Sequence, residues 1–222
     1  MSSNLVNFHF DLLPYSIDDT AVTKFAQLAE LITKWNKTFN LLGFNSVDEL
    51  VSKHFLDSLM VLPYLEGTHI ADVGTGAGFP GLPLAIAKPQ WQFTLVDSNS
   101  KKTRFVQQAV IELGLQNVQV HHGRVESITS QNTNAGQPIE KFNTVVSRAF
   151  SDLSLFVQNS GNICKEKGLL LAMKGRYPKQ EIEQFNTTFM LDDTAHFKIE
   201  AVHEVDVPKL DAERHVVLIR KC

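Results

Sequence analysis

The sequence predicts an α/β fold with a mostly parallel sheet, an antiparallel pair of C-terminal strands and an N-terminal helical extension. From residue 68 onward, short apolar runs alternate with segments of helical periodicity, which is typical of a parallel sheet covered by helices. The last two apolar runs, 199–205 and 215–220, are separated by turn residues without a helix, which favours an antiparallel pair. Before residue 66 the apolar pattern is helical.

Two amphipathic helices are expected in the N-terminal extension. Over residues 18–40, apolar side chains recur every three or four positions and form one stripe. The second helix begins at Ser46, where Ser46 and Glu49 form a capping box in which each side chain satisfies the other residue's backbone N–H. We therefore expect a helical extension at 1–65 and a main domain at 66–222.

The main domain is predicted to alternate strands and helices. The expected strands are 70–73, 93–96, 118–121, 144–147, 169–173, 199–205 and 215–220. The expected helices are 82–87, 100–113, 152–164 and 179–191. The polar stretch around 130–138 is expected to be a surface loop, to which no function is assigned.

A glycine-rich segment follows the first predicted strand. Gly74, Gly76, Gly78 and Gly81 lie within eight residues, which permits positive φ angles and a close approach of the backbone to a ligand. A helix that starts at Leu82 would offer unpaired N–H groups and the positive end of its dipole. We expect the segment to hold an anionic group of a nucleotide-like ligand, with a simple tight turn as the alternative.

Composition restricts the classes of partner. The 222 residues contain 21 Lys and Arg against 24 Asp and Glu, a formal charge of -3, so any nucleic-acid binding must use a local patch. Cys164 and Cys222 are far apart and form no CxxC, which predicts neither a disulfide framework nor a zinc site. No segment reaches the ~18 uninterrupted apolar residues that a bilayer span needs. We expect a cytoplasmic protein without membrane contact.

Polar residues follow the predicted strands, at the sheet edge where open α/β folds bind ligands. Asp72 closes the first strand, Asp97 the second, Arg148 follows the fourth and Lys174 the fifth. Asp97 is well placed to accept hydrogen bonds from both hydroxyls of a ribose.

The glycine pattern is compatible with two kinds of cofactor. Residues 76–81 match G-x-G-x-x-G and Asp97 follows about 20 residues later, as in dinucleotide-binding folds. However, Asp72 stands where a dinucleotide-binding strand is normally apolar, and the main domain accounts for about one sheet, without a further substrate domain. These features favour S-adenosylmethionine over a nicotinamide.

Purely structural roles remain open for the charged candidates. Asp97 could cap a helix that begins near Ser98 or Ser100, a role compatible with ribose binding. Arg148 and Lys174 could each be solvated surface charges. Their joint position at strand ends favours function.

Two weaker candidates lie in the N-terminal helices. His54 and Asp57 are one helical turn apart, and a hydrogen-bonded pair is favoured over a metal site because the spacing supplies no third ligand. Trp35, Phe39 and Phe44 could stack on a base, but their helical spacing is more typical of a core stripe.

Several motifs coincide with one known family. They are WNKTFNLLG (35–43), HFLDSL (54–59), DVGTGAGFPGLPLAI (72–86), VDSNSKK (96–102), GRVE (123–126), SRAF (147–150), KG (174–175) and ERH (213–215). Together they resemble the bacterial 16S ribosomal RNA guanine-N7 methyltransferases, also called the glucose-inhibited division protein B family. The resemblance implies a class I methyltransferase (Rossmann-like) fold, S-adenosylmethionine as cofactor, and one guanine of the small-subunit RNA as substrate.

The resemblance also implies the residues of the site. The expected cofactor contacts are Asp72, Gly74, Gly76, Gly78, Phe79, Asp97, Val125, Glu126 and Arg148. The expected substrate contacts are Lys174, Arg176, Arg214 and His215. A wider set of cations is expected to capture RNA, namely Lys101, Lys102, Arg104, Arg148, Lys174, Arg176, Arg214 and Arg220.

Methylation at guanine N7 needs no catalytic base, because N7 already carries a lone pair. Arg148 is therefore expected to act by orienting the guanine or its phosphate through its planar donor groups. We expect no metal, 16S RNA or the small ribosomal subunit as partner, no DNA partner, and a monomer. The competing hypotheses are a methyltransferase for small molecules or proteins, a noncatalytic RNA-binding factor, and a nicotinamide oxidoreductase.

Overall fold

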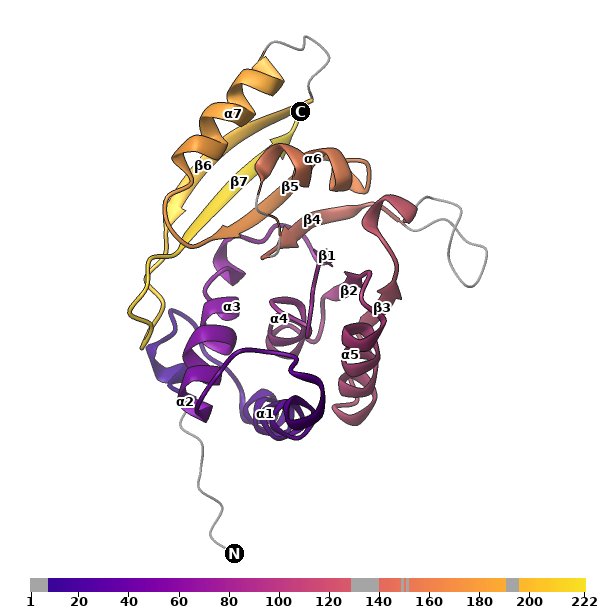
Figure 1. Cartoon of the computed structure of the whole chain (residues 1–222), viewed down its shortest axis with the longest axis vertical. Coiled ribbons are helices and arrows are strands. Elements are labelled where there is room, and N and C mark those ends of the chain that lie inside the picture. Colours follow the sequence, from indigo (N-terminus) through magenta and orange to yellow (C-terminus); the bar gives the residue numbers. More distant parts are fainter. Residues whose placement is uncertain (1–7, 129–139, 149, 151, 191–195) are drawn as a thin grey trace, which may run out of the picture.

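The computed structural model describes residues 8–128, 140–148, 150, 152–190 and 196–222. Within these ranges, seven strands form one sheet in the order β3-β2-β1-β4-β5-β7-β6 (Figure 1). Strands β1 to β5 pair in parallel, and β7 pairs antiparallel with both β5 and β6. The predicted α/β class and its antiparallel C-terminal pair are confirmed. The predicted loop at 130–138 lies outside the described residues.

The elements have the following bounds. The strands are β1 His69–Val73, β2 Gln92–Asp97, β3 Val118–His122, β4 Phe142–Ser147, β5 Cys164–Lys174, β6 Phe197–Glu204 and β7 His215–Lys221. The α-helices are α1 Asp19–Phe39, α2 Val47–Leu50, α3 Asp57–Leu59, α4 Gly81–Ala87, α5 Ser100–Glu112, α6 Leu153–Ser160 and α7 Lys179–Met190. None of the helices in the described ranges is long and apolar enough to cross a membrane.

Helices cover both faces of the sheet. Successive residues of a strand point to opposite faces, so neighbours along one strand belong to different cores. Ile70, Val146 and Leu171 belong to a core shared with α1, α4 and α5, whereas their neighbours Ala71 and Val145 belong to a second core with α6 and α7. Figure 1 shows α6 and α7 on one side of the sheet and α1, α3, α4 and α5 on the other. Burial on both faces explains why the central strands β1, β2 and β4 are largely apolar runs, whereas the edge strand β3 alternates.

The N-terminal helices share a core with the sheet. Asp18 caps α1 by accepting the backbone N–H of Ala21 at 2.8 Å. Trp35 packs against Phe39 with the two rings tilted and meets the edge of Phe105 from α5, with ring centroids 5.2 and 5.5 Å apart. The core interpretation of this aromatic stripe is confirmed for Trp35, although Phe39 is exposed.

The second predicted helix is interrupted. Between α2 and α3 the backbone takes a π-helical form over Val51–Leu56. Ser46 caps the start by accepting the N–H of Glu49, but the Glu49 carboxylate accepts the N–H of Asn45 and not that of Ser46. The predicted capping box is therefore half correct.

Helix α6 is shorter than predicted, and β5 begins earlier. Residues 161–164 were expected to be helical, but Cys164 is already in β5 and lies opposite Phe142 of β4. The polar residues 165–167 give this start of the strand no apolar signal in the sequence. Lys167 has a φ of 61°, which interrupts the extended backbone of the strand. A local helical pattern was thus overridden by pairing with β4.

We expect Asn117→Ala to lower the free energy of unfolding by about 2–3 kcal/mol, because one buried amide satisfies three carbonyl groups. Asn117 Nδ2 donates to the carbonyl oxygens of Ala85, Lys88 and Trp91 at 3.1–3.3 Å and so ties the end of α4 to β3. Urea denaturation would measure the loss, with the exposed neighbour Gln116→Ala as control. Equal stabilities of the two variants would contradict this role.

Candidate active site

The glycine loop after β1 is held by its own backbone. Gly74, Gly76 and Gly78 have φ angles of 70°, 60° and 91°. The N–H groups of Gly74 and Thr75 donate to Val96 O of β2 at 2.8 and 3.0 Å. A side chain at Gly78 would collide with Leu82, so the glycine is required there for space as well as for its φ angle.

A buried carboxylate fastens the loop to α4. Asp72 lies in β1, and the residue is 0% exposed. Its Oδ2 accepts the Thr75 hydroxyl at 2.6 Å and the N–H of Gly81 at 2.7 Å. A Cβ at Gly81 would lie 2.8 Å from that oxygen, so glycine permits the close approach.

These bonds give Asp72 a structural role in the loop and engage the helix start that was expected to face a ligand. The first N–H of α4 is bound by the chain's own carboxylate, and the N–H of Leu82 donates to Gly78 O at 2.7 Å. The start of α4 therefore does not offer these two donors to a ligand, and the anion at this position is Asp72. The other oxygen of Asp72, Oδ1, is buried without a hydrogen-bond partner among the described residues, and the predicted contact of Asp72 with a cofactor stays a prediction.

Asp97 stands at the end of β2 with both oxygens oriented. Its Oδ2 accepts the N–H of Gly76 at 2.8 Å, and its Oδ1 accepts the N–H of Asn99 at 2.7 Å. The alternative in which Asp97 caps α5 is wrong, because Asn99 is the cap and accepts the N–H groups of Lys101 and Lys102. Asp97 thus couples the glycine loop to the turn after β2.

A first cavity of about 320 Å³ opens at the carboxyl ends of β1, β2 and β3. Four predicted cofactor residues line it, namely Gly74, Asp97, Val125 and Glu126. It is also lined by residues that were not predicted: Val73, Val96, Ser98, Gly123, Arg124, Phe150 and Asn159. Of these, Gly123 and Arg124 stand in the GRVE motif and could have been found from it, whereas Asn159 lies on α6 with no local signal.

Several predicted cofactor contacts lie elsewhere. Gly78 and Phe79 are buried behind the loop, where Phe79 stacks on Phe55 with centroids 5.9 Å apart. Gly76 is partly exposed but reaches the first cavity's wall through its bond to Asp97. Arg148 lines a different cavity. Direct cofactor contact by Gly78 and Phe79 is therefore not supported by their placement.

The second cavity measures about 700 Å³ and lies between the N-terminal helices and the ends of β4 and β5. Its wall carries five cationic side chains, Lys53, Arg148, Lys174, Lys209 and Arg214, together with the acidic Glu49, Asp57 and Asp211. Arg148 lines this cavity, and Phe150, two residues later, lines the first. The segment after β4 therefore contributes to both cavities.

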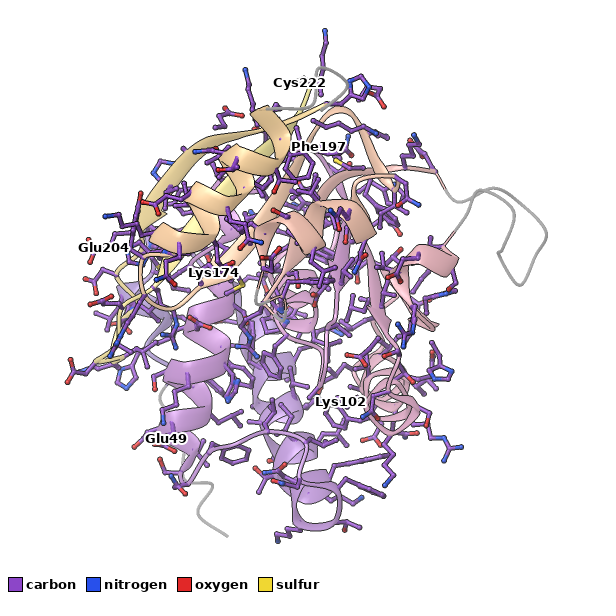
Figure 2. The ribbon with its side chains drawn as sticks, turned by 45° about the horizontal axis from the view of Figure 1, so that its top comes forward. Glu49, Lys102, Lys174, Phe197, Glu204 and Cys222 are labelled. Atoms are coloured by element: carbon purple, nitrogen blue, oxygen red, sulfur yellow. The ribbon has the colours of Figure 1, made fainter. Side chains whose placement is uncertain are left out.

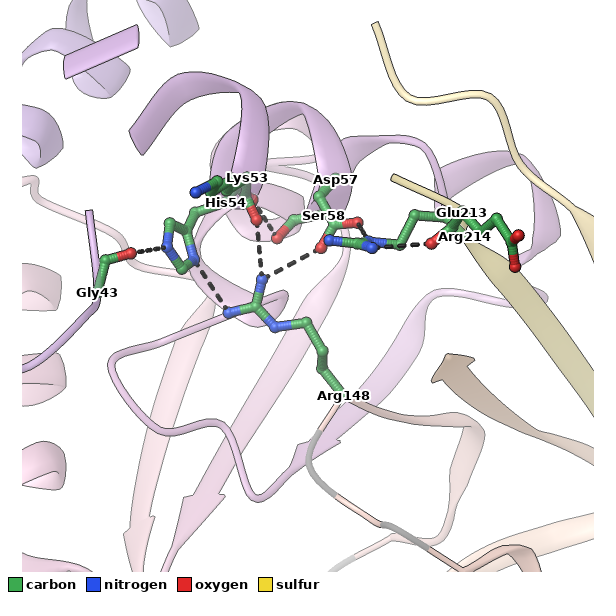
Figure 3. A network of polar contacts seen from close by, with 8 residues as sticks. All are labelled: Gly43, Lys53, His54, Asp57, Ser58, Arg148, Glu213 and Arg214. Carbon is green, nitrogen blue, oxygen red and sulfur yellow. Dashed lines mark hydrogen bonds and ion pairs between the residues drawn. The ribbon is translucent and has the colours of Figure 1, made fainter. Parts of the chain in front are cut away.

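Arg148 is held by the N-terminal helices (Figure 3). Its guanidinium donates to Asp57 Oδ2 at 3.2 Å and lies 3.3 Å from His54 Nδ1. It also lies over the ring of Phe79, 5.4 Å from the centroid. The predicted pairing of His54 with Asp57 is wrong in detail, since each contacts Arg148 and no direct hydrogen bond joins them among the described contacts.

The predicted substrate residues have different environments. Arg214 lines the second cavity and donates to Asp57 Oδ1 at 2.7 Å. Lys174 lies where β5 meets α7 (Figure 2), and its ammonium is bound by Glu181 at 2.6 Å and by Phe150 O at 2.9 Å. His215 is only 8% exposed and its ring nitrogen bonds Gly175 O at 2.8 Å. His215 thus supports the turn after β5, and its predicted contact with the substrate stays a prediction.

Two members of the wider set of cations that was expected to capture RNA, Arg220 and Arg176, do not line the second cavity. Arg220 is bound by both carboxylate oxygens of Glu66 at 2.7 Å and by Glu200 at 2.6 Å, so it serves as a link between β6, β7 and the N-terminal segment. Arg176 is exposed but is not part of the cavity wall. Among the described residues, no group of three or more His, Cys, Asp and Glu is arranged to hold a metal ion.

Comparison with known proteins identifies the family. A family model described as rRNA small subunit methyltransferase G matches residues 21–217. The chain belongs to this family. A relative from Nitrosospira multiformis, named ribosomal RNA small subunit methyltransferase G, is 43% identical over 216 residues, which cover 94% of this chain and 93% of the relative. A relative of the same name from Nitrosococcus oceani is 41% identical, with 99% and 95% covered.

Solved structures support the fold of this member of the rRNA small subunit methyltransferase G family. An O-methyltransferase from Bacillus cereus in complex with SAH aligns with a TM-score of 0.61 at 13% identity, covering 96% of this chain and 94% of the other. A methyltransferase described as SAM dependent, from Aquifex aeolicus, aligns with a TM-score of 0.55 at 18% identity, covering 87% and 98%. The predicted family and the methyltransferase fold are confirmed.

The buried carboxylate of this rRNA small subunit methyltransferase G family member predicts a pH dependence of stability. Burial raises the pKa of Asp72 from 3.8 to about 6, although its hydrogen bonds from Thr75 and Gly81 oppose the shift. Between about pH 4 and 6 the folded protein therefore binds a proton that the unfolded chain releases. The resulting stabilisation is complete below pH 4 and is lost as the pH rises through 6.

We expect the stability of the wild type, relative to Asp72→Asn, to fall by about 2 kcal/mol between pH 4 and 7. Asparagine has the same shape and keeps an acceptor for Thr75 and Gly81, so the difference isolates the ionisation. Urea denaturation at several pH values would measure it. A difference that stays flat across this range would contradict the raised pKa.

Proposed function

We propose that this chain transfers a methyl group from S-adenosylmethionine to N7 of a guanine in 16S ribosomal RNA. The observation that carries the proposal is the first cavity, where an oriented carboxylate and apolar walls meet at the carboxyl ends of β1 to β3. Membership of the rRNA small subunit methyltransferase G family supports the choice of RNA as substrate. The position of the guanine in the RNA is outside the proposal.

The first cavity fits the adenosine part of the cofactor. Asp97 accepts one backbone N–H at each oxygen, and each oxygen keeps acceptor capacity for a ribose hydroxyl. Val96 and Val125 supply apolar wall for a flat ring, and Glu126 supplies an acceptor at the margin. When bound, the cofactor supplies an electrophilic methyl group on a sulfonium sulfur.

The second cavity suits the RNA. Its wall carries Lys53, Lys209 and Arg214 beside Arg148, and cationic groups of this kind bind phosphates and orient bases. We propose that Arg148 orients the target guanine or its phosphate, as a group that binds the substrate. Exposed Arg176 extends the cationic surface beyond the cavity.

A reaction at N7 agrees with the groups around Arg148. Burial and the neighbouring guanidinium lower the pKa of His54 to about 4, so this imidazole is a weak base. Asp57 has both oxygens bound by arginines. Neither group is arranged to remove a proton, and N7 needs none removed. The residues of this chain would therefore act by orientation and by exclusion of water.

We further propose that the protein acts in the cytoplasm, where bacterial small subunits are assembled, and that it acts as a monomer. The partner is 16S RNA or the small subunit, without DNA or membrane. The decisive experiment is to map 7-methylguanosine in small-subunit RNA from cells with and without the gene. One guanine should lose its methyl group in the deletion strain, and restoration should require the intact gene.

Substitution of Asp97 should weaken the binding of S-adenosylmethionine while the protein still folds. We expect Asp97→Ala to raise the Kd for S-adenosylmethionine about 10- to 100-fold, because two hydrogen bonds to the ribose are lost. Calorimetry would measure this, with the exposed Glu204→Gln on β6 as control (Figure 2). An Asp97→Ala variant that binds no cofactor and still performs its cellular role would instead support a noncatalytic RNA-binding factor.

A further inference from the structure

Asp57 is a buried carboxylate with two arginine partners from distant parts of the chain. It belongs to α3, and its side chain is 2% exposed. Oδ2 is 3.2 Å from Arg148 Nη1, which follows β4, and Oδ1 is 2.7 Å from Arg214 Nε, which precedes β7. Figure 3 shows the two guanidinium groups approaching the same carboxylate. The partners are 91 and 157 residues away in sequence.

The two arginines remain on the wall of the second cavity while Asp57 holds them. Each keeps about a quarter of its side chain exposed. A guanidinium has five N–H donors, so one or two bonds to Asp57 leave others for a ligand. A long side chain that is already fixed also loses less entropy when it binds. Asp57 therefore holds two guanidinium groups in fixed positions on the cavity wall before a ligand binds.

Arg148 has further constraints on its position. His54 Nδ1 lies 3.3 Å from Nη2, Lys53 O lies 3.5 Å from Nη1, and the guanidinium covers the ring of Phe79 in the glycine loop. His54 and Lys53 both belong to the π-helical segment. Such segments displace side chains from the regular helical spacing, and here His54 and Asp57 reach one guanidinium.

We propose that Asp57 is a positioning residue that fixes the guanidinium groups of Arg148 and Arg214 for the RNA substrate. This inference rests on the proposed function. It gives the N-terminal helices a part in the reaction beyond core packing, because the orienting carboxylate comes from them. The competing explanation is that Asp57 merely staples the N-terminal helices to the sheet.

The chain offers a matched control for that explanation. Glu66 also belongs to the segment before β1 and also binds an arginine of the C-terminal strands, Arg220. Neither Glu66 nor Arg220 lines the second cavity. Glu66→Gln therefore removes an arginine link between the same two parts of the chain without touching the cavity wall, although Glu66 is 52% exposed and Asp57 only 2%.

The principal experiment compares Asp57→Asn with Glu66→Gln in methylation of purified small subunits. We expect Asp57→Asn to lower kcat/KM about 100-fold, with the Kd for S-adenosylmethionine changed less than twofold. Glu66→Gln should change kcat/KM less than threefold. Equal losses in the two variants would overturn the proposal.

A second readout follows the position of Arg148 directly. The pKa of His54 is lowered first by burial and then by Arg148, is raised to smaller extents by the hydrogen bond with Gly43 O and by Asp57, and is lowered slightly by Lys53. If Asp57→Asn releases Arg148, the pKa of His54 should rise, because the larger effect is lost. If Arg148 stays in place, the pKa should fall. NMR titration of His54 distinguishes the two, and a fall would overturn the proposal.

A conservative variant covers the case in which Asp57→Asn does not fold. Asp57→Glu keeps the charge that pairs with the arginines but displaces the carboxylate by one methylene. We expect a folded protein whose kcat/KM is about 10-fold lower, and a wild-type rate would contradict positioning. The NMR readout needs no substrate. Failure of the wild type to methylate small subunits would therefore count against the proposed function and leave the positioning of Arg148 separately testable.

Discussion

The glycine loop depends on one buried carboxylate. Asp72 accepts the Thr75 hydroxyl and the first N–H of α4, so one side chain fixes the turn, the helix and their distance from β1. Burial of an ionised group is costly, and the hydrogen bonds offset that cost only in part, as the raised pKa of Asp72 indicates. The fixed loop then places Gly76 to orient Asp97, so the first cavity inherits its shape from Asp72.

The second cavity repeats this use of a buried carboxylate over a longer range. Asp57 lies between guanidinium groups from the ends of two distant strands, and the cavity wall forms around them. A buried ion pair contributes little net stability in general, so geometry is a better explanation for its presence than strength. Asp72 organises a local turn, whereas Asp57 connects three separate parts of the chain.

Local sequence patterns were sufficient to predict the fold and part of the lining of the first cavity. Apolar runs located all seven strands, and Asp97 was identified by its place at a strand end, because parallel strands end at one edge of a sheet. Val125 and Glu126, which line the same cavity, came from the family resemblance. The family resemblance supplied the cofactor and substrate. The strands and Asp97 could be predicted because they depend on short sequence windows and on the common edge at which parallel strands end.

Long-range contacts account for what was missed. A carboxylate before a glycine loop looks like a ligand group in sequence, but burial against α4 makes Asp72 structural. His215 and Arg220 look available for RNA, yet Gly175 and Glu66 bind them. The start of β5 at Cys164 depends on pairing with Phe142. None of these partners is visible in a local window.

The position of β7 in the sheet has a consequence for the order of synthesis. Strand β6 is made first, but in the sheet its neighbour is β7, which separates it from β5. The first cavity is lined by residues up to Asn159, whereas the second needs the segment from Lys209 to Arg214. A growing chain can therefore complete the lining of the first cavity well before that of the second, and β6 must wait for β7 before it joins the sheet.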